Sequence, residues 1–484
     1  MSDKSLKKRT VGAIMWSGIG HLATVLITFI SNMVLSRLLV PEDFGCIGML
    51  LIFITISDAL AIGGLGQALI QKKNPSHVDY STVFYCNVFA SLFFYFVIFF
   101  IAPYIAQFYK MPVLCDVMRV QSLTIVFHAI YVVQSTQLQR DLKFKEFSIR
   151  NIIAAICGTC VAVIIALNGG GVWSLVFSAV TASVVSLFLL WNMSKWRPTL
   201  EFSWKSFKEL FLFGGMIMLS NIFERVYSNI QGLVIGRFYS ARDMGYYSQA
   251  YKLEQIPVST ISMTVSQVSF PVFSSLQDNL ENVKNAVKKN IVCLTYLNFP
   301  VSLLMMVLAS PLIHLFYGSK WDEAIPYFQI LCLAGLFTTI NAMNINVIKG
   351  LGKGKLFFYV QVAKRIVGIT FILIGAYIGM YGILWAAVGV AVFEFILNGI
   401  LNNKLIGYGI FLQLKDVSVN VVMTFLALIP VLLLSVLDNN QFLVMFSQIF
   451  VFLISYIFLS VLFKSSAFEL YKKIVVETLK KYSK

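Results

Sequence analysis

The sequence has very little charge for its length. Only 12% of its 484 residues are Asp, Glu, Lys or Arg, whereas 58% are hydrophobic. Soluble globular domains carry about 25% charged residues, so this chain lacks the polar side chains that a water-exposed surface needs. Apolar runs of roughly 18 residues or more, each long enough to cross a bilayer, recur from Val11 to Phe463. The composition therefore excludes a soluble protein and predicts a polytopic helical membrane protein.

The sequence also lacks the parts that several classes of protein require. Loops between the apolar runs are at most roughly 15 residues long, which leaves no room for an extramembrane catalytic or nucleotide-binding domain. No GxxxxGK[ST] phosphate-binding loop occurs, so primary ATP-driven transport by this chain alone is not expected. No nucleophile–base constellation is found, and the chain is predicted not to be an enzyme.

Cysteine and histidine are too few and too scattered for a disulfide framework or a metal site. Nearly all of the seven cysteines lie inside apolar stretches, including Cys157 and Cys160 of the sequence CGTC. That spacing resembles a redox motif but lacks the soluble βαβ context, so we interpret it as small residues at a helix contact. The four histidines show no ligand spacing, and no metal is expected.

The apolar runs give fourteen candidate spans, of which the eighth is unusually polar. The first is too long for the apolar core of a signal peptide, so we expect it to remain in the mature protein. The candidates cover residues 11–36, 44–69, 80–108, 113–138, 147–167, 171–192, 209–236, 243–275, 290–317, 322–348, 356–378, 381–401, 417–437 and 441–463.

Lys and Arg are distributed unequally between the two sides of the predicted membrane. With the N-terminus in the cytoplasm, the inner segments contain 28 of the 38 Lys and Arg residues and the outer loops contain five. This bias predicts cytoplasmic N- and C-termini and an even number of spans. It also accounts for most of the +16 net charge, so a nucleic-acid partner is not needed.

Residues 464–484 have a helical spacing of apolar side chains with lysines between them. This pattern predicts an amphipathic helix on the cytoplasmic lipid surface, with a frayed soluble tail as the alternative. The apolar positions are Phe468, Tyr471, Val475, Leu479 and Tyr482.

One short connector occurs twice at a fixed offset. Residues 36–45 read SRLLVPEDFG and residues 236–245 read GRFYSARDMG, so that Arg37, Asp43 and Gly45 recur after 200 positions. Six predicted spans lie between the copies, so the second half repeats the first in the same orientation, as in many secondary transporters. We expect an architectural role at an outer corner of each half, where the glycine permits a tight turn.

The repeat predicts the fold class and the domain organisation. We expect an all-α integral membrane protein of about 14 transmembrane helices, with two parallel six-helix repeats and two C-terminal helices. The N-terminal lobe would cover residues 1–195, the C-terminal lobe 196–404, the two additional helices 405–463, and the cytoplasmic amphipathic tail 464–484.

The connector, the number of spans, the sequence QLQRDLKFKEF after the fourth span and GLGKGK after the tenth resemble a known family. They are similar to Wzx-type lipid-linked oligosaccharide flippases, in the polysaccharide transport branch of the MOP flippase superfamily. The resemblance implies two lobes around a central cavity that opens alternately to each side. It implies a secondary transporter that flips a polyprenyl-pyrophosphate-linked oligosaccharide to the outer leaflet of the bacterial inner membrane, for O-antigen, capsule or exopolysaccharide biosynthesis.

The same resemblance implies an H⁺ or Na⁺ gradient as the energy source and no cofactor. Membrane lipids are implied partners, and polymerase and export machinery are candidate partners. Two other functions stay open. A multidrug or cation exporter of the same superfamily would favour unpaired cavity carboxylates, whereas cationic and anionic residues are mixed here. A membrane-embedded glycan polymerase or ligase would need a sizeable outer loop with catalytic residues, and the outer loops are short.

Ionisable residues inside the predicted spans are the candidate functional residues. Each costs several kcal/mol in a bilayer unless it faces a polar cavity or a partner. The candidate cations for binding pyrophosphate or an acidic sugar are Arg225, Lys252, Lys364 and Arg365, and the coupling or cavity carboxylates are Asp58, Glu224, Glu254 and Glu394. The charges in the seventh and eighth spans have no counterpart in the first half, so the shared fold does not require them.

Some of these residues have a second interpretation. Neighbours on one helix do not face each other, so Arg225 could pair with Glu254, and Glu224 with Lys252, as structural salt bridges between spans. Lys364 and Arg365 could anchor the helix at the cytoplasmic interface instead. Asp58 and Glu394 are the best candidates for proton or sodium coupling, and each could equally be a satisfied polar contact.

Overall fold

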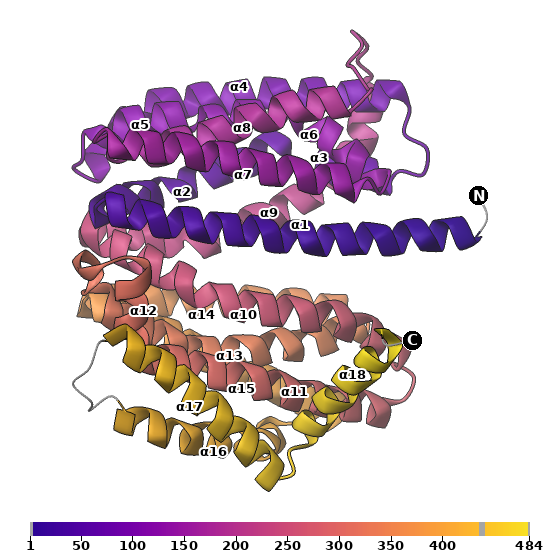
Figure 1. Cartoon of the computed structure of the whole chain (residues 1–484). Coiled ribbons are helices and arrows are strands. Elements are labelled where there is room, and N and C mark those ends of the chain that lie inside the picture. Colours follow the sequence, from indigo (N-terminus) through magenta and orange to yellow (C-terminus); the bar gives the residue numbers. More distant parts are fainter. Residues whose placement is uncertain (1–2, 435–440, 483–484) are drawn as a thin grey trace. The chain divides into compact units, whose positions relative to one another are not determined.

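The structure, a computed structural model, describes residues 3–434 and 441–482, with side chains throughout except at 3–11, 13–14, 263–268, 270–271, 474–475 and 478–482. All regular elements in these ranges are helices (Figure 1), which confirms the all-α class. They are α1 (Asp3–Leu38), α2 (Pro41–Ile62), α3 (Leu65–Gln71), α4 (His77–Phe108), α5 (Val113–Gln121), α6 (Leu123–Arg140), α7 (Phe144–Leu167), α8 (Trp173–Met193), α9 (Trp204–Phe238), α10 (Ala241–Ser275), α11 (Leu280–Val307), α12 (Ala309–Phe316), the 3₁₀ helix η1 (Ser319–Trp321), α13 (Ala324–Gly350), α14 (Gly354–Ile378), α15 (Met380–Ile406), α16 (Ile410–Leu434), α17 (Gln441–Leu462) and α18 (Ser466–Tyr482).

Thirteen helical segments within the described residues are long and apolar enough to cross a membrane. They confirm the predicted multi-pass membrane protein. The predicted eighth span corresponds to α10, a continuous helix of 35 residues whose side chains at 263–268 and 270–271 lie outside the described ones.

Two glycines divide the second predicted span, 44–69, into α2 and α3. Gly63 and Gly64 have φ angles of +57° and +70°, which side-chain-bearing residues avoid. A Cβ on Gly64 would also lie 2.6 Å from the carbonyl oxygen of Gly214 in α9. The glycine pair therefore ends α2 and lets α9 approach closely at the same point.

The chain forms two compact units, Met1–Gly245 and Tyr246–Lys484. The first contains α1 to α9 and the first turn of α10. Within it, α7 packs against α1 and α8, α6 packs against α4 and α8, and α2 packs against α4 and α9 (Figure 1). The predicted boundaries of the repeated lobes stay predictions.

In the second unit, α13 packs against both α11 and α15. Helix α14 packs against α15, and α16 packs against α11 and α17. Helix α10 lies against α13, where Gly335 and Gly350 leave room for the side chains of Glu254 and Phe273. The core of this unit includes Val287, Leu294, Met343, Val347 and Phe395.

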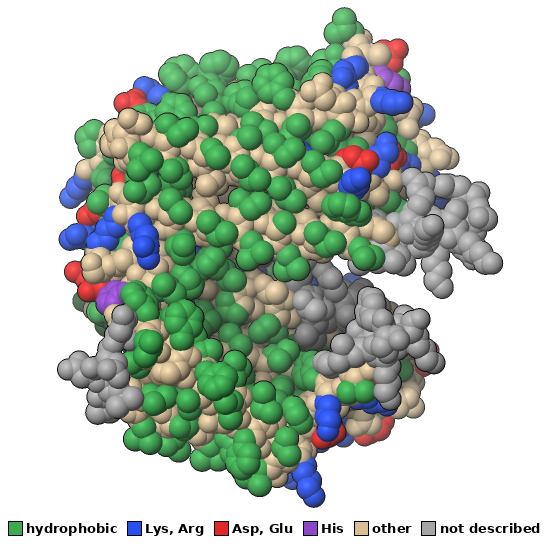
Figure 2. All heavy atoms as spheres, viewed as in Figure 1, with side chains coloured by type: hydrophobic (Ala, Val, Ile, Leu, Met, Phe, Trp, Pro, Cys, Tyr) green, Lys and Arg blue, Asp and Glu red, His purple; other side chains and the backbone are tan. Residues whose placement is uncertain are grey.

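Large hydrophobic side chains are exposed along the outer helices of each unit. Examples are Phe93, Phe100 and Tyr104 of α4 and Phe446 and Phe450 of α17, all at least 62% exposed. Figure 2 shows hydrophobic side chains over most of the face drawn and charged side chains gathered toward the helix ends. Such extended apolar surface is typical of helices that face lipid.

The two copies of the repeated connector touch each other within the first unit. Gly45 leaves no room for a Cβ beside the backbone of Ala241, and Gly245 leaves none beside the backbone of Pro41. The contact is reciprocal, because the shift of 200 also relates Pro41 to Ala241. The predicted tight turn is wrong, since neither glycine has a positive φ. The glycines instead allow two helix starts to approach each other at backbone distance.

The repeated aspartates cap the same two helices. Asp43 Oδ2 accepts a hydrogen bond from the backbone N–H of Val40 at 3.2 Å. Asp243 Oδ2 accepts from the backbone N–H of Ser240 at 3.2 Å and from its hydroxyl at 2.6 Å. A carboxylate in the first turn satisfies an otherwise unpaired N–H and interacts favourably with the helix dipole. Asp and Gly of the connector therefore have architectural roles.

Candidate functional site

Asp58, predicted as a coupling carboxylate, pairs with a histidine in the first unit. Its Oδ1 atom lies 2.8 Å from Nδ1 of His128, so the pair joins α2 to α6. The two side chains are 32% and 35% exposed, so the pair is not sealed inside the helix packing. The pair gives each of these side chains a polar partner within membrane helices, where an ionisable group without one is costly.

Two further residues extend this pair, and neither was expected from the sequence. The rings of His128 and Tyr131 are 5.1 Å apart. The guanidinium of Arg150 on α7 lies 5.7 Å from the centroid of Tyr131 and 4.8 Å from that of Phe147. Arg150 is 9% exposed, and its Nε atom has no hydrogen-bond partner among the described residues. Arg150 lies near the start of the predicted span 147–167 and is counted with the inner-side cations; it is in the second turn of α7, which begins at Phe144.

Helix α9 packs against α2 and runs antiparallel to it. Asn229 Nδ2 lies 3.5 Å from Thr55 Oγ1. Further along, Met218 of α9 lies beside Gly63 of α2. As the residue numbers rise along α2, they fall along the facing α9.

This arrangement brings Glu224 and Arg225 to the level of Asp58. Both lie between the two contacts just described, as Asp58 does on α2, and both side chains are exposed. Glu224 Oε1 accepts a hydrogen bond from the Ser228 hydroxyl at 3.2 Å. Charges this far from the ends of a membrane helix avoid lipid when they face a polar cavity. Their exposure within the first unit fits that environment.

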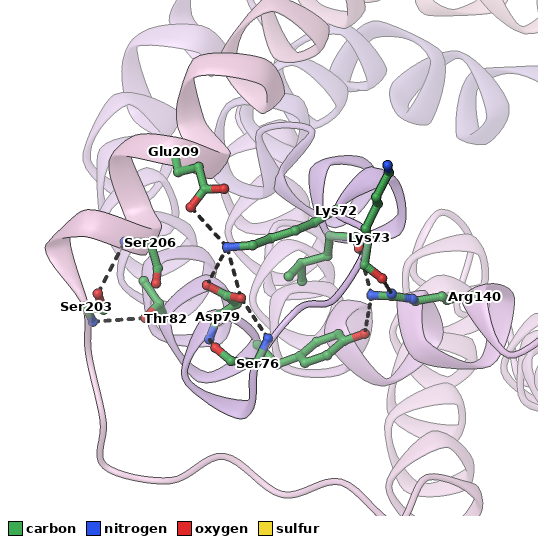
Figure 3. A network of polar contacts seen from close by, with 11 residues as sticks. Lys72, Lys73, Ser76, Asp79, Thr82, Arg140, Ser203, Ser206 and Glu209 are labelled. Atoms are coloured by element: carbon green, nitrogen blue, oxygen red, sulfur yellow. Dashed lines mark hydrogen bonds and ion pairs between the residues drawn. The ribbon is translucent and has the colours of Figure 1, made fainter.

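An ion-pair network holds the start of α9 in the first unit (Figure 3). Lys72 Nζ lies 3.1 Å from Asp79 Oδ2 and 3.0 Å from Glu209 Oε2. Partial burial lowers the pKa of Lys72, but its hydrogen bonds to Glu209 and Asp79 outweigh burial and raise the pKa above its ordinary value. Beside this network, Arg140 donates to the backbone oxygen of Lys73 at 2.6 Å. Ser203 also donates its backbone N–H to Thr82 Oγ1 at 3.0 Å, so three segments predicted on the inner side, near 72, 140–150 and 195–208, meet at one end of this unit.

Lys252 and Glu254 lie in the second unit and have different surroundings. Glu254 is 4% exposed and lies against Gly335 of α13. Its Oε2 atom accepts a hydrogen bond from the side-chain amide of Gln255 at 2.9 Å. Lys252 is exposed. The cross-helix pairs predicted with α9 join residues of the two units and stay predictions.

Lys364 and Glu394 form an ion pair between α14 and α15. The Nζ and Oε2 atoms are 3.5 Å apart, with 4% and 21% of the side chains exposed. The sequence predicts Lys364 as a substrate-binding cation and Glu394 as a coupling carboxylate, and the structure brings these two side chains together. Snorkelling to the membrane surface does not describe the buried Lys364. Arg365, the next residue, is half-buried.

Buried amides that the sequence analysis did not single out connect helices of the second unit. Asn398 Nδ2 donates to Asn341 Oδ1 at 3.1 Å, and Asn402 Nδ2 donates to Asn344 Oδ1 at 2.9 Å, which joins α15 to α13. Asn344 Nδ2 donates in turn to Gln413 Oε1 at 3.0 Å in α16. Hydrogen bonds of this kind stabilise helix packing in membranes by roughly 1 kcal/mol each. The two asparagines are three residues apart in α13 and four residues apart in α15, which places each pair on one helix face; this spacing could have identified them.

Ionisable side chains lie within the helices of both units. Most of them lie in pairs, against aromatic rings or on exposed helix faces, whereas Glu254 is buried and accepts a hydrogen bond from Gln255. Within the described part of the chain, no three His, Cys, Asp or Glu side chains lie close enough together to hold a metal ion. The chemistry that this arrangement offers is recognition of anions and exchange of protons or other cations.

Comparison with known proteins gives relatives over most of the chain. Residues 34–326 match a family model described as "Polysaccharide biosynthesis protein". The lipopolysaccharide biosynthesis protein WzxC of Escherichia coli K12 is 26% identical over 408 residues, which are 83% of this chain and 80% of WzxC. The succinoglycan biosynthesis transport protein ExoT of Rhizobium meliloti is 27% identical over 351 residues, which are 72% of this chain and 70% of ExoT.

Solved structures share the fold. The lipid II flippase MurJ aligns with a TM-score of 0.76 over 96% of this chain and 100% of MurJ, at 14% identity. A multidrug resistance MATE family transporter of the MOP superfamily gives a TM-score of 0.61 over 81% of this chain and 98% of the transporter, at 14% identity. These findings confirm the resemblance that the connector carries. The family model matches well over half of the length of this chain, and the chain therefore belongs to the polysaccharide biosynthesis protein family.

Proposed function

We propose that the chain is a carrier, not an enzyme, which flips a polyprenyl-pyrophosphate-linked oligosaccharide from the inner to the outer leaflet by alternating access. The product would enter O-antigen, capsule or exopolysaccharide biosynthesis. The observation that carries the proposal is the set of ionisable groups held inside membrane helices, above all Asp58 with His128 and Lys364 with Glu394. Such groups are costly in a bilayer and mark ion and substrate pathways.

The substrate would be held through its negative charge. Arg225 and Lys252 are exposed cations within predicted spans, one in each unit, and guanidinium and ammonium groups both bind phosphate oxygens. Arg150 adds a buried guanidinium beside the ring of Tyr131, which in turn lies next to His128. These positions support contact with a pyrophosphate or an acidic sugar. Arg365 is a further candidate for the same role.

The energy source would be a cation gradient, with no cofactor. Asp58 with His128 is the pair we assign to proton exchange, because an imidazole and a carboxylate share one hydrogen bond at a partly exposed position. Glu224, Glu254 and Glu394 are further cavity or coupling carboxylates. The buried position of Glu254 and the lysine partner of Glu394 make these two less accessible to ions than Asp58.

The protein would lie in the bacterial inner membrane with both termini in the cytoplasm. The lysine and arginine bias supports this orientation. The network of Lys72, Asp79 and Glu209 is consistent with it, because it joins segments predicted on the inner side. Polymerase and export machinery would act on the product after it has crossed.

Export of drug-like cations is a second candidate function, because the fold is shared with a multidrug transporter. Deletion of the gene in its native host separates the two. Build-up of lipid-linked repeat units on the cytoplasmic leaflet supports flipping. Build-up on the outer leaflet contradicts it in favour of a polymerase or ligase, and increased drug sensitivity without any lipid-linked intermediate favours the exporter.

A further inference from the structure

Helices α11 and α18 of the second unit form an open groove with a volume of about 540 Å³. Its lining combines lysines with aliphatic side chains, and it includes one carboxylate. The lining residues are Lys289, Ser466, Glu469, Leu470, Lys472, Lys473 and Val476.

The groove is a fixed part of the unit, because α18 is anchored on α11. Tyr471 donates a hydrogen bond from its hydroxyl to the backbone oxygen of Cys293 at 3.2 Å. Its ring stacks on Tyr296, with centroids 5.9 Å apart. Ala467 is fully buried in the same cluster of hydrophobic residues. Lys289 lies one helical turn before Cys293, so the docked α18 and this lysine share one face of α11.

The groove lies where the apolar part of the unit ends. The last residues of α17, including Val461 and Leu462, are 58% and 62% exposed and apolar. Lys464 then turns the chain with a φ of +48°, and α18 begins at Ser466. Exposed apolar side chains followed at once by lysines mark the boundary between hydrocarbon and headgroups. The groove is thus at the level of lipid headgroups.

The charge of the lining is positive. The lining contains three lysines and one glutamate. Lys473 Nζ also lies 4.0 Å from Glu477 Oε1, on the solvent side of α18. Leu470 and Val476 supply an apolar wall between the lysines. A phosphodiester beside acyl chains is the ligand that matches both properties at this depth. We propose that the groove binds the headgroup of an anionic phospholipid, a role independent of substrate flipping.

The test uses the full chain purified in a neutral detergent. Its thermal unfolding midpoint is measured while phosphatidylglycerol, phosphatidylcholine or inorganic phosphate is added. We expect phosphatidylglycerol to raise the midpoint, and phosphatidylcholine and free phosphate to leave it unchanged. In the triple variant Lys289→Gln, Lys472→Gln, Lys473→Gln, about 100-fold more phosphatidylglycerol should be needed for half of the effect, since each lysine contributes about fivefold.

The matched control removes three other exposed lysines of the same unit, as Lys353→Gln, Lys355→Gln, Lys404→Gln. It should respond to phosphatidylglycerol as the unaltered chain does. An unchanged response of the groove variant, an equal loss in the control, or the same stabilisation by inorganic phosphate overturns the proposal. If the groove triple does not fold, the single variant Lys472→Gln, at an exposed position, should still show the fivefold shift.

Discussion

Glu42 and Arg242 form an ion pair in which Oε1 and Nε are 3.1 Å apart. A shift of 200 residues relates these two positions, so one place in the repeated connector meets its own counterpart. The side chains are 43% and 55% exposed, and such a pair contributes at most about 1 kcal/mol. The closely packed backbones at Gly45 and Gly245, rather than the ion pair, therefore hold these two helix starts together.

Replacing either connector glycine should destabilise the protein. In Gly45→Ala or Gly245→Ala the new methyl meets backbone atoms, which cannot move aside as a flexible side chain can. We expect a loss of roughly 1–3 kcal/mol, seen as a lower thermal unfolding midpoint in detergent. Gly354→Ala is the control, because it also lies in the first turn of a helix and nothing lies within 4 Å of its Cβ position. Equal midpoints for Gly45→Ala and Gly354→Ala would contradict the close approach.

The Lys364–Glu394 pair should show strong coupling in a double-mutant cycle. Lys364→Met leaves a carboxylate without its partner between α14 and α15, and breaking a buried pair costs about 3–5 kcal/mol. The double variant Lys364→Met, Glu394→Gln should recover most of that stability. Unfolding midpoints measure both effects. Additive losses would show that the two side chains do not interact, and loss of flipping in a stable double variant would assign the pair to transport.

Asp58 and His128 should both be needed for transport but not for folding. Asp58→Asn should abolish flipping, and His128→Gln should slow it by roughly tenfold or more, as expected for a coupling free energy of 1–3 kcal/mol. Both residues are about one-third exposed, so the variants should reach the membrane in normal amounts. His21→Gln, at an exposed position on α1, is the matched control. Wild-type flipping by His128→Gln would remove the histidine from the coupling pair.

His314 should make stability depend on pH. Its Nε2 lies 2.6 Å from Asp322 Oδ1 and its Nδ1 lies 3.1 Å from Gln441 Oε1, so two acceptors face the ring. Partial burial lowers the pKa of His314, but the hydrogen bonds to Gln441 and Asp322 outweigh it and raise the pKa above its ordinary 6.5. The stabilisation is therefore complete below pH 6.5 and is lost as the pH rises through the raised value.

The comparison of the unaltered chain with His314→Gln isolates this contribution from the other histidines. Unfolding midpoints are measured from about pH 5.5 to 8.5, the range in which histidine titrates. The difference between the two proteins should be largest at the acidic end and shrink with rising pH. A difference that stays constant or grows with pH would show that the charged ring does not stabilise this contact.

Local sequence was sufficient for the helices and for the connector. Long apolar runs predict spans because crossing a bilayer requires them. Repetition of Asp43 and Gly45 pointed to architecture, and the capping and the close backbone contact explain it. The division of a span at Gly63 and Gly64 was missed, since a helix pattern does not show which glycine takes a positive φ.

The partners of the charged residues could not be predicted in the same way. His128 is 70 positions from Asp58, and Glu394 is 30 from Lys364. Two side chains on different helices meet only if each helix is rotated and packed so that they face each other. The local spacing of residues does not encode this rotation or packing. Arg150 was missed for a different reason: it lies near the start of the predicted span 147–167 and is counted with the cations of the inner loop.

Flipping by the purified chain in liposomes tests the central claim most directly. Vesicles hold a polyprenyl-pyrophosphate-linked oligosaccharide and a proton or sodium gradient, and an external glycosidase reports the glycan that has crossed. The expected result is rapid crossing with the unaltered chain, and crossing at the rate of protein-free vesicles with folded Asp58→Asn. Crossing at the protein-free rate with the unaltered, folded chain under both gradients would contradict a flippase.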